Sequence, residues 1–344
     1  MPTPRRTSAR WRRCRALASG ASGSVPAASR RSPSPTDRLT DERYCPPMLD
    51  PREAIDRLTA AYRGPHPGHR TLHARGTFYE GTFTAGAEAA ELCRAAVFSG
   101  EPVPVLVRWS NGAGSPRIPD KAPDVRGMAV KLRTSAGDTD LLGQTAPRFP
   151  VRSPEDFVSM TEATRRPATF PLWVARHPGT IGAFVANARG GAIKPPFSYA
   201  EKTYYPIHAY GWVDGDGTLR WVRYVLRPQE GRRPSGSFEG AARLTQEVVA
   251  RLAEGPVRYD VEVTVAADGD DPHDPTSVWT GSRRFVAGVI EVTAPVDDPE
   301  TTGEPVVFDP TRVVDGIELS DDPILRYRPV AYTESVSRRT SDSP

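Results

Sequence analysis

Short runs of alternating apolar and polar positions recur along the chain and predict β-strands. Runs of this kind, many of them rich in valine, cover residues 71–84, 103–109, 127–133, 148–152, 204–213, 219–226, 257–266 and 285–292. Between the fifth and sixth runs lies Asp214-Gly215-Asp216-Gly217, a sequence typical of a hairpin turn. The pattern therefore predicts a largely antiparallel sheet.

Other segments carry apolar positions three and four residues apart, which predicts helices. They cover residues 51–62, 87–98, 153–164, 172–188, 238–253 and 323–339. Ser153-Pro154-Glu155-Asp156 combines a cap, a first-turn proline and acids. Pro329 either kinks the last helix or marks its first turn. The order of elements predicts an α+β fold, an antiparallel β-barrel with surrounding helices.

Composition separates a tail from a body. The chain has 344 residues and 38% hydrophobic content, which suffices for a sizeable core. Residues 1–47 contain ten arginines against three acids and almost no apolar run. We therefore expect a disordered basic tail over 1–47 and a single domain over 48–344. A second interpretation takes Met48 as the true start of the protein.

Several classes of protein lose support. No stretch approaches 18 apolar residues, so we expect no membrane span. Only Cys14, Cys45 and Cys93 occur, which gives no disulfide framework and suits a reducing compartment. We expect a cytoplasmic location, with export left open by the arginine pairs in the tail. No glycine-rich nucleotide motif follows a strand, and we expect no nucleic-acid partner.

Two segments at opposite ends of the body carry the candidate chemistry. Arg70-x-x-His73 offers an imidazole that can shuttle protons. Arg328-x-x-x-Tyr332, with Arg339 beyond it, offers a phenol that can bind iron. The two arginines are cations on the same helix face as this phenol. Each segment also has a plain structural interpretation, as a core histidine or as a surface helix with cation–π contacts.

A zinc site is a further alternative in the first segment. His66, His69 and His73 have a spacing that could place three imidazoles around a metal ion. Pro65 and Pro67 preclude a regular helix there, and no acid or cysteine lies close by in the sequence. We expect His66 and His69 to be exposed to solvent instead.

Five motifs occur in the order and at the spacings found in haem catalases. They are Arg70-Thr-Leu-His73-Ala-Arg-Gly76, Val107-Arg-Trp-Ser110, Asp124-Val-Arg-Gly127-Met-Ala-Val-Lys131, Asp140-Leu-Leu-Gly143 and Arg328-Pro-Val-Ala-Tyr332. The chain thus resembles the haem catalase family over residues 54–339, and most closely its small branch of catalase-related peroxidases. The resemblance implies a catalase-like barrel and a bound heme b with its iron.

The resemblance also implies roles at the iron. Tyr332 matches the proximal tyrosine that binds the metal, and Arg328 matches the cation that keeps this phenol ionised. His73 matches the distal histidine, which takes a proton from peroxide and returns it to the departing oxygen. Ser110 matches the serine that orients this imidazole.

Further residues match positions around the porphyrin. Arg70 and Arg108 match partners of the haem propionates, and Arg339 also suits a propionate, because guanidinium forks bind carboxylates well. Phe157 matches an aromatic side chain that packs on the haem. These assignments, like those at the iron, are what the resemblance implies.

The sequence departs from the larger catalases on the distal side. Gln144 and Thr145 replace two asparagines, the second of which bonds peroxide in those enzymes, so we expect slow catalase turnover. We expect Thr145 to offer one hydroxyl in its place. Gly112 replaces a channel valine and predicts wider access, whereas Asp124 keeps the channel carboxylate.

We therefore expect a haem peroxidase that uses hydrogen peroxide or an organic hydroperoxide to oxidise an unknown reductant in the oxidative stress response. Weak catalase activity is its expected side reaction. Two alternatives stay open. One is a haem-dependent isomerase or dehydratase of fatty-acid hydroperoxides, and the other is a non-catalytic haem-binding protein. The sequence leaves a homo-oligomer open as well.

Overall fold

The computed structural model describes residues 49–166, 168–229, 231, 233–299 and 305–341. The predicted tail over 1–47 lies outside the described residues. Residues from Asp50 onward form one compact unit. None of the helices within the described ranges is long and apolar enough to cross a membrane.

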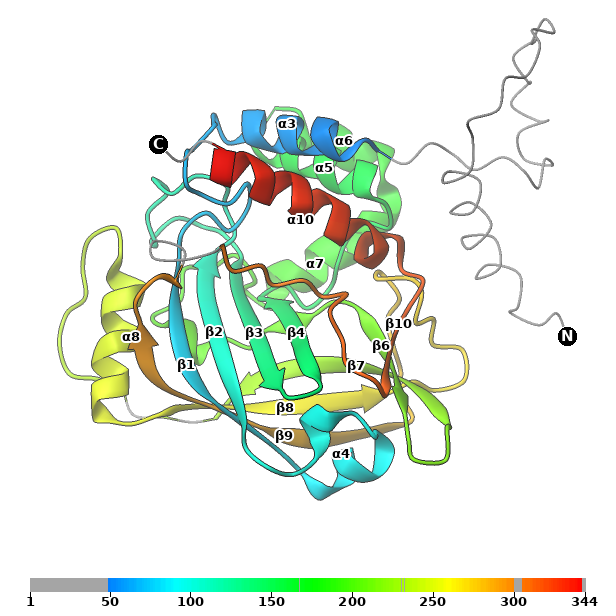
Figure 1. Ribbon diagram of the computed structural model, residues 1–344. Helices are drawn as coiled ribbons and strands as arrows, with labels where there is room; N and C mark the ends of the chain where they lie inside the picture. Colours follow the sequence, from blue (N-terminus) through cyan, green and yellow to red (C-terminus); the bar gives the residue numbers. More distant parts are fainter. Residues whose placement is uncertain (1–48, 167, 230, 232, 300–304, 342–344) are drawn as a thin grey trace, which may run out of the picture. The chain divides into compact units, whose positions relative to one another are not determined.

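One ten-stranded antiparallel sheet organises this unit (Figure 1). In space the strands follow the order β10-β6-β7-β8-β9-β1-β2-β3-β4-β5. Their bounds are β1 Gly76–Ala85, β2 Val103–Asn111, β3 Arg126–Thr134, β4 Gly137–Gln144, β5 Tyr205–Pro206, β6 Ala209–Val213, β7 Leu219–Pro228, β8 Val257–Val265, β9 Arg283–Val296 and β10 Ile317–Leu319.

The sheet curls until β5, at one end of the strand order, reaches β7. Tyr204, just before β5, and Leu226 of β7 each donate a backbone hydrogen bond to the other, at 2.9 and 2.8 Å. Alternate side chains point into the curl and fill it, as the period-two pattern predicts. The large side chains buried there include Tyr79, Trp109, Tyr204, Trp212 and Tyr259.

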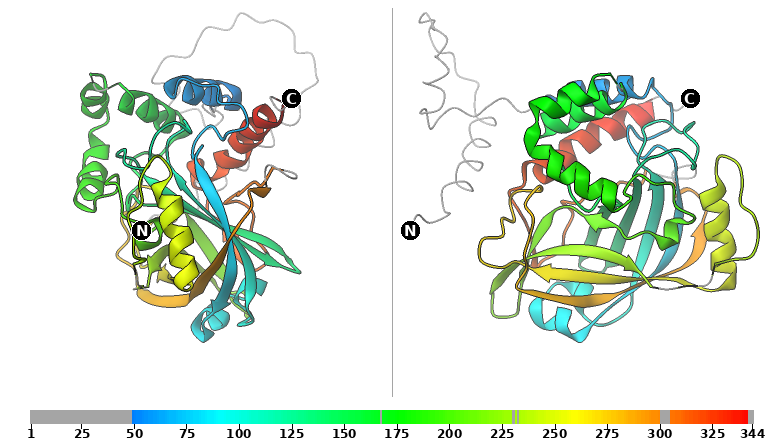
Figure 2. Two further views of the ribbon diagram at one scale, coloured as in Figure 1. Left: turned by 90° about the vertical axis from the view of Figure 1, so that its left-hand side faces the viewer. Right: turned by 180° about the vertical axis from the view of Figure 1, so that it is seen from behind.

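Helices surround the curled sheet, which confirms the predicted α+β class. The helices are α3 Pro51–Ala61, α4 Ala87–Leu92, α5 Pro154–Thr164, α6 Phe170–Arg176, α7 Ile181–Arg189, α8 Arg243–Glu254 and α10 Pro323–Ser341. Short 3-10 turns cover Ala96–Phe98, Pro178–Thr180 and Tyr199–Glu201. Helices α3, α5 and α10 pack on one another at one end of the sheet (Figures 1 and 2).

Several predicted bounds are wrong, each for a local reason. The described residues 148–152 form no strand; their apolar side chains Phe149 and Val151 pack with Trp173 beneath the helices instead. Strand β4 was not predicted, and β1 begins five residues later than its sequence pattern. Pro178 divides the helix predicted over 172–188 into α6 and α7.

Candidate active site

His73 lies in the loop that leads into β1, in an unusual backbone conformation. Its φ is 55°, a left-handed value that costs a residue with a Cβ atom about 1–2 kcal/mol. Hydrogen bonds hold this loop in place: the amides of His73 and Ala74 donate to Gly112 and Ala113 at 3.0 Å. The Arg108 guanidinium also donates to the His73 carbonyl at 3.0 Å. These hydrogen bonds therefore fix the position of the His73 backbone, from which the imidazole extends.

The imidazole of His73 is held by β2 and β3. Its Nδ1 lies 3.0 Å from the Ser110 hydroxyl, as the resemblance implies. A Cβ added at Gly127 would lie only 2.7 Å from both Cε1 and Nδ1 of the ring. The ring thus rests on bare backbone, and the bond at Nδ1 leaves Nε2 for a substrate.

The electrostatic surroundings keep this imidazole neutral. Burial is the largest influence, and the cations Arg108, Arg328 and Arg70 add to it, so the pKa of His73 falls to about 3. At neutral pH the ring can therefore accept a proton. This is the state that a general base requires before the reaction starts.

Two predicted propionate partners stand beside this loop. Arg108 is buried on β2, where Gly76 leaves it room; a Cβ there would lie 2.7 Å from the guanidinium carbon. Arg70 donates to the Val306 carbonyl at 2.8 Å. Both are close enough to His73 to lower its pKa. The two arginines thus place positive charge close to a neutral ring.

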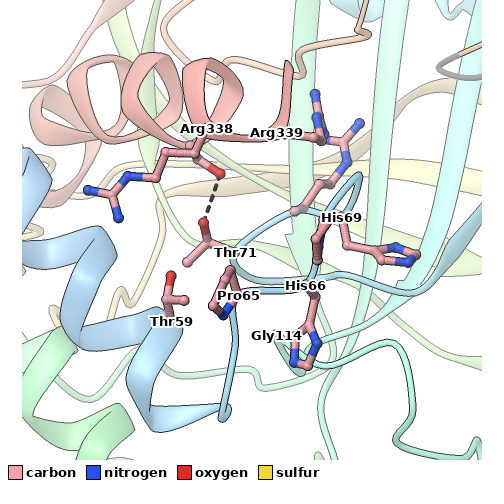
Figure 3. Close-up of a pocket in the computed structure, with 11 residues that line it drawn as sticks. Thr59, Pro65, His66, His69, Thr71, Gly114, Arg338 and Arg339 are labelled. Atoms are coloured by element: carbon pink, nitrogen blue, oxygen red, sulfur yellow. Dashed lines mark hydrogen bonds between the residues drawn. The ribbon is translucent and has the colours of Figure 1, made fainter. Parts of the chain in front are cut away.

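A cavity of about 300 Å³ joins the early segment to the end of α10. Both Arg70 and Arg339 line it (Figure 3), although they are 269 positions apart in the sequence. Its lining does not include His73 or Tyr332. The structure therefore brings two of the three predicted propionate arginines to one cavity.

The predicted proximal residues lie half-buried on α10. Arg328 is near enough to His73 to lower the pKa of the imidazole. The pKa of Tyr210 is raised; Arg328 opposes this rise, and Tyr332 adds to it. No hydrogen bond links the Tyr332 side chain to Arg328 or to His73 in the described part of the chain. The pairing of Tyr332 with an iron thus stays a prediction.

A buried pair behind α10 escaped the sequence analysis. His208 Nδ1 lies 2.5 Å from an Asp322 carboxylate oxygen, and both side chains are about 1% exposed. Asp322 also accepts from the Ile324 amide at 2.8 Å and so caps α10. Burial lowers the pKa of His208, and Arg328 lowers it further. An acidic residue just before Pro323 is the sequence signal that could have predicted this cap. No signal in the sequence pointed to His208.

The two distal positions that differ from larger catalases have settled partners. Thr145 is buried; its hydroxyl donates to the Ala192 carbonyl at 2.7 Å and accepts from the Arg126 amide at 3.0 Å. Gln144 donates to the Ala146 carbonyl at 3.1 Å. The prediction that Thr145 offers a free hydroxyl is therefore wrong, because one backbone group accepts a hydrogen bond from this hydroxyl and another donates one to it.

Gly112 does not open the channel as predicted. A Cβ there would collide with the Val125 side chain and would lie 3.0 Å from an Asp124 oxygen. These neighbours fill the space that a side chain would take. Asp124 accepts from the Ala113 amide at 2.8 Å, and burial raises the pKa of its carboxyl.

Phe157 lies on α5 and stacks on Phe149, with ring centroids 5.8 Å apart. It packs against a small apolar cluster that includes Trp173 and Ile324 of α10. Phe157 of α5 and Ile324 of α10 thus belong to the same apolar cluster. The contact of Phe157 with haem stays a prediction.

The zinc alternative gains no support. His66 faces the Tyr62 carbonyl at 3.2 Å, and it is half-buried rather than exposed as predicted, whereas His69 is exposed. Within the described ranges no three histidine, cysteine or acidic side chains gather in a metal-binding arrangement.

The curled sheet with its cap of helices, and the histidine–serine pair ringed by arginines, define a catalase-like protein. A sequence model of the family described as Catalase matches residues 27–343. The chain belongs to the catalase family.

Its relatives include small members of this family. A catalase-related peroxidase of Mycolicibacterium paratuberculosis is 42% identical over 301 residues, covering 85% of this chain and 95% of the relative. Another, of Synechococcus elongatus, is 31% identical and covers 85% and 89%. A solved fungal catalase superposes with a TM-score of 0.69 at 22% identity, covering 92% of this chain and 66% of that structure. The chain thus spans about two thirds of the solved catalase.

Proposed function

We propose that this protein is a heme b peroxidase that uses hydrogen peroxide or an organic hydroperoxide to oxidise a small reductant. Its main support is the neutral imidazole of His73, which Ser110 orients close to several arginines. Membership of the catalase family supports a haem, since the family depends on that cofactor.

The residues present fit a haem. Arg70, Arg108 and Arg339 would hold its two propionates, and Phe157 would pack on its face. Tyr332 would bind the iron, with Arg328 keeping the phenol ionised. When bound, haem supplies an iron that exchanges electrons with peroxide and with the reductant.

The protein's own part is to move one proton and to hold the reactants in place. His73 Nε2 would take a proton from one oxygen of the peroxide and give it to the other oxygen, which leaves as water or alcohol. For every peroxide, two reductant molecules would each supply one electron and one proton, so that hydrogen peroxide becomes two waters and an organic hydroperoxide becomes one alcohol and one water. Ser110 and Gly127 keep the imidazole oriented while the proton moves.

The distal side favours peroxidase over catalase chemistry. With its hydroxyl bonded to backbone groups on both sides, Thr145 does not replace the asparagine that bonds peroxide in larger catalases. Losing such a positioned donor costs about 10²–10³ in rate. We therefore place oxygen release well below reductant oxidation in this enzyme.

His73→Ala tests the proposal. The variant should retain haem, because the imidazole does not bind the iron, but its reaction with peroxide should slow by about 10²–10⁴-fold. The measurement is reductant oxidation and oxygen release by the purified haem protein, with hydrogen peroxide and with cumene hydroperoxide.

His177→Ala is the matched control, since this histidine lies at the end of α6 and bonds the Trp173 carbonyl. Full activity in His73→Ala would contradict the distal assignment. Conversion of a fatty-acid hydroperoxide without use of a reductant would favour the isomerase or dehydratase instead.

A further inference from the structure

Helices α6 and α7 carry an apolar surface that the candidate active site does not use. Ten large apolar side chains are exposed in the described part of the chain, and five of them lie within one short segment: Leu172, Ile181, Val185, Ile193 and Phe197. Figure 2 shows both helices, in green, at an outer edge of the unit that begins at Asp50. Apolar side chains gathered in this way mark a surface that contacts another molecule or a membrane.

Helix geometry explains why these side chains are exposed. Ile181 and Val185 are four residues apart on α7, so they lie on one face. Phe184 lies on another face of α7, and its ring centroid is 5.4 Å from that of Phe170 and 6.4 Å from that of Trp173 on α6. Both helices thus turn aromatic side chains toward a shared cluster. None of the residues of α7 is fully buried, so its aliphatic face is left to solvent.

The same segment of the chain is basic. Between Glu162 and Glu201 the sequence has five lysines and arginines and no acid. The body over residues 48–344 has the opposite balance, with 39 acids against 35 lysines and arginines. The segment is therefore a positive region on an otherwise acidic body, and such a region attracts anionic surfaces.

Three of these cations flank the aliphatic side chains. Arg176 follows Leu172 by four residues on α6, and Arg189 follows Val185 by four on α7, so each shares a helix face with its aliphatic neighbour. Lys194 lies in the turn after α7. All three are exposed, and none forms an ion pair within the described ranges. Together these side chains form the α6–α7 surface, which comprises Leu172, Arg176, Ile181, Val185, Arg189, Ile193 and Lys194.

We propose that the α6–α7 surface docks on a membrane that contains anionic lipids. Its aliphatic side chains enter the boundary between headgroups and acyl chains, and its cations bind the lipid phosphates. A second copy of the chain fits this surface less well, because a two-fold contact would place the same cations against one another. The surface contains none of the residues assigned to haem or to peroxide, so its docking is independent of the proposed function.

Sedimentation with sucrose-loaded vesicles tests the proposal on the purified protein. Vesicles made from equal parts of phosphatidylcholine and phosphatidylglycerol should bind the protein, and vesicles of phosphatidylcholine alone should bind it about tenfold less. Binding to the anionic vesicles should weaken as salt is added, because ions screen the attraction.

A pair of double variants tests the charges of the surface. Arg176→Glu with Arg189→Glu should lower the partition coefficient for anionic vesicles by about tenfold or more. Arg133→Glu with Arg284→Glu changes the net charge equally at exposed positions of β3 and β9. This control should bind nearly as well as the wild type, since its altered charges lie outside the α6–α7 surface.

A second pair tests the aliphatic side chains. Ile181→Ser with Val185→Ser should weaken binding about tenfold, because less apolar area leaves water on docking. Val249→Ser with Val286→Ser is the matched control: these valines are 42% and 44% exposed on α8 and β9, whereas Ile181 and Val185 are 48% and 41% exposed. Circular dichroism should show the same folded spectrum for every variant.

Equal binding to the two kinds of vesicle, or equal effects of the surface variants and their controls, would overturn the proposal. A dimer that forms without lipid and becomes a monomer in Ile181→Ser with Val185→Ser would also overturn it, since the surface would then be a subunit interface. Oxidation of a soluble reductant should be the same in the wild type and in Arg176→Glu with Arg189→Glu. Failure of docking and failure of the proposed function therefore give different results.

Discussion

The chemistry assigned to His73 depends on features of single residues around it. A left-handed φ, a hydroxyl at Nδ1 and a bare glycine behind the ring together allow one orientation of the imidazole. Burial and three cations then keep the ring neutral. Each feature comes from a different segment of the chain, so the orientation depends on how β2 and β3 pair.

Gly127→Ala tests the support of the ring. The new Cβ would crowd the imidazole and the Ser110 hydroxyl, 2.9 Å away, and the ring must turn. We expect haem to be retained and the reaction with peroxide to fall by about 10²-fold, as a misplacement near 1 Å does. Stopped-flow mixing with peroxide measures this.

Gly182→Ala in α7 is the control, because nothing lies within 4 Å of its added Cβ. Its peroxide rate should equal that of the wild type. A normal rate in Gly127→Ala would show that the ring does not depend on this glycine.

For single residues, the sequence predicted which residues belong to the site better than it predicted which groups they contact. The residues His73, Ser110 and Arg108 could be named from ordered motifs, and the structure brings all three together. The sequence could not show that the Thr145 hydroxyl is used by Arg126 and Ala192, since those partners come from distant segments. Side-chain partners of this kind follow from the tertiary structure.

The elements that hold the site follow local rules, with departures where packing decides. Helix α5 has its predicted cap and first-turn proline, and α10 begins at Pro323 after the Asp322 cap. Pro329 lies inside α10, so the alternative that it marks the first turn of the helix is wrong. The kink of the other alternative stays a prediction. Strand β4 was missed because Gly, Asp and Thr begin it and its apolar positions are few.

Ser153→Ala tests the cap of α5. The Ser153 hydroxyl accepts from the Asp156 amide at 3.1 Å, and its loss should cost about 1 kcal/mol of unfolding free energy. Because α5 carries Phe157, haem should also dissociate more readily. Denaturant unfolding and haem transfer to apomyoglobin measure the two effects.

Ser153→Asp is the conservative comparison, since aspartate caps helices about as well as serine. It should unfold like the wild type. If Ser153→Ala kept full stability, the cap would contribute nothing measurable to α5.

At the scale of the whole molecule, the fold brings the two ends of the body to one place. The early loop lies at the mouth of the curled sheet, and α10 crosses the same end together with α3 and α5 (Figure 1). Arg70 and Arg339 line one cavity as a result. The sequence motifs show the order of these segments along the chain, whereas their meeting in space follows from the tertiary structure.

We propose that a haem lies between His73 and Tyr332, with Tyr332 bound to the iron. The most direct measurement is the ferric absorption spectrum of the purified protein and of Tyr332→Phe, with Tyr327→Phe on the same helix as control. Tyr327 is buried, and its hydroxyl has no hydrogen-bond partner among the described residues. Tyr332→Phe should shift the spectrum or abolish haem retention, and Tyr327→Phe should do neither. An unchanged spectrum in Tyr332→Phe would contradict the account.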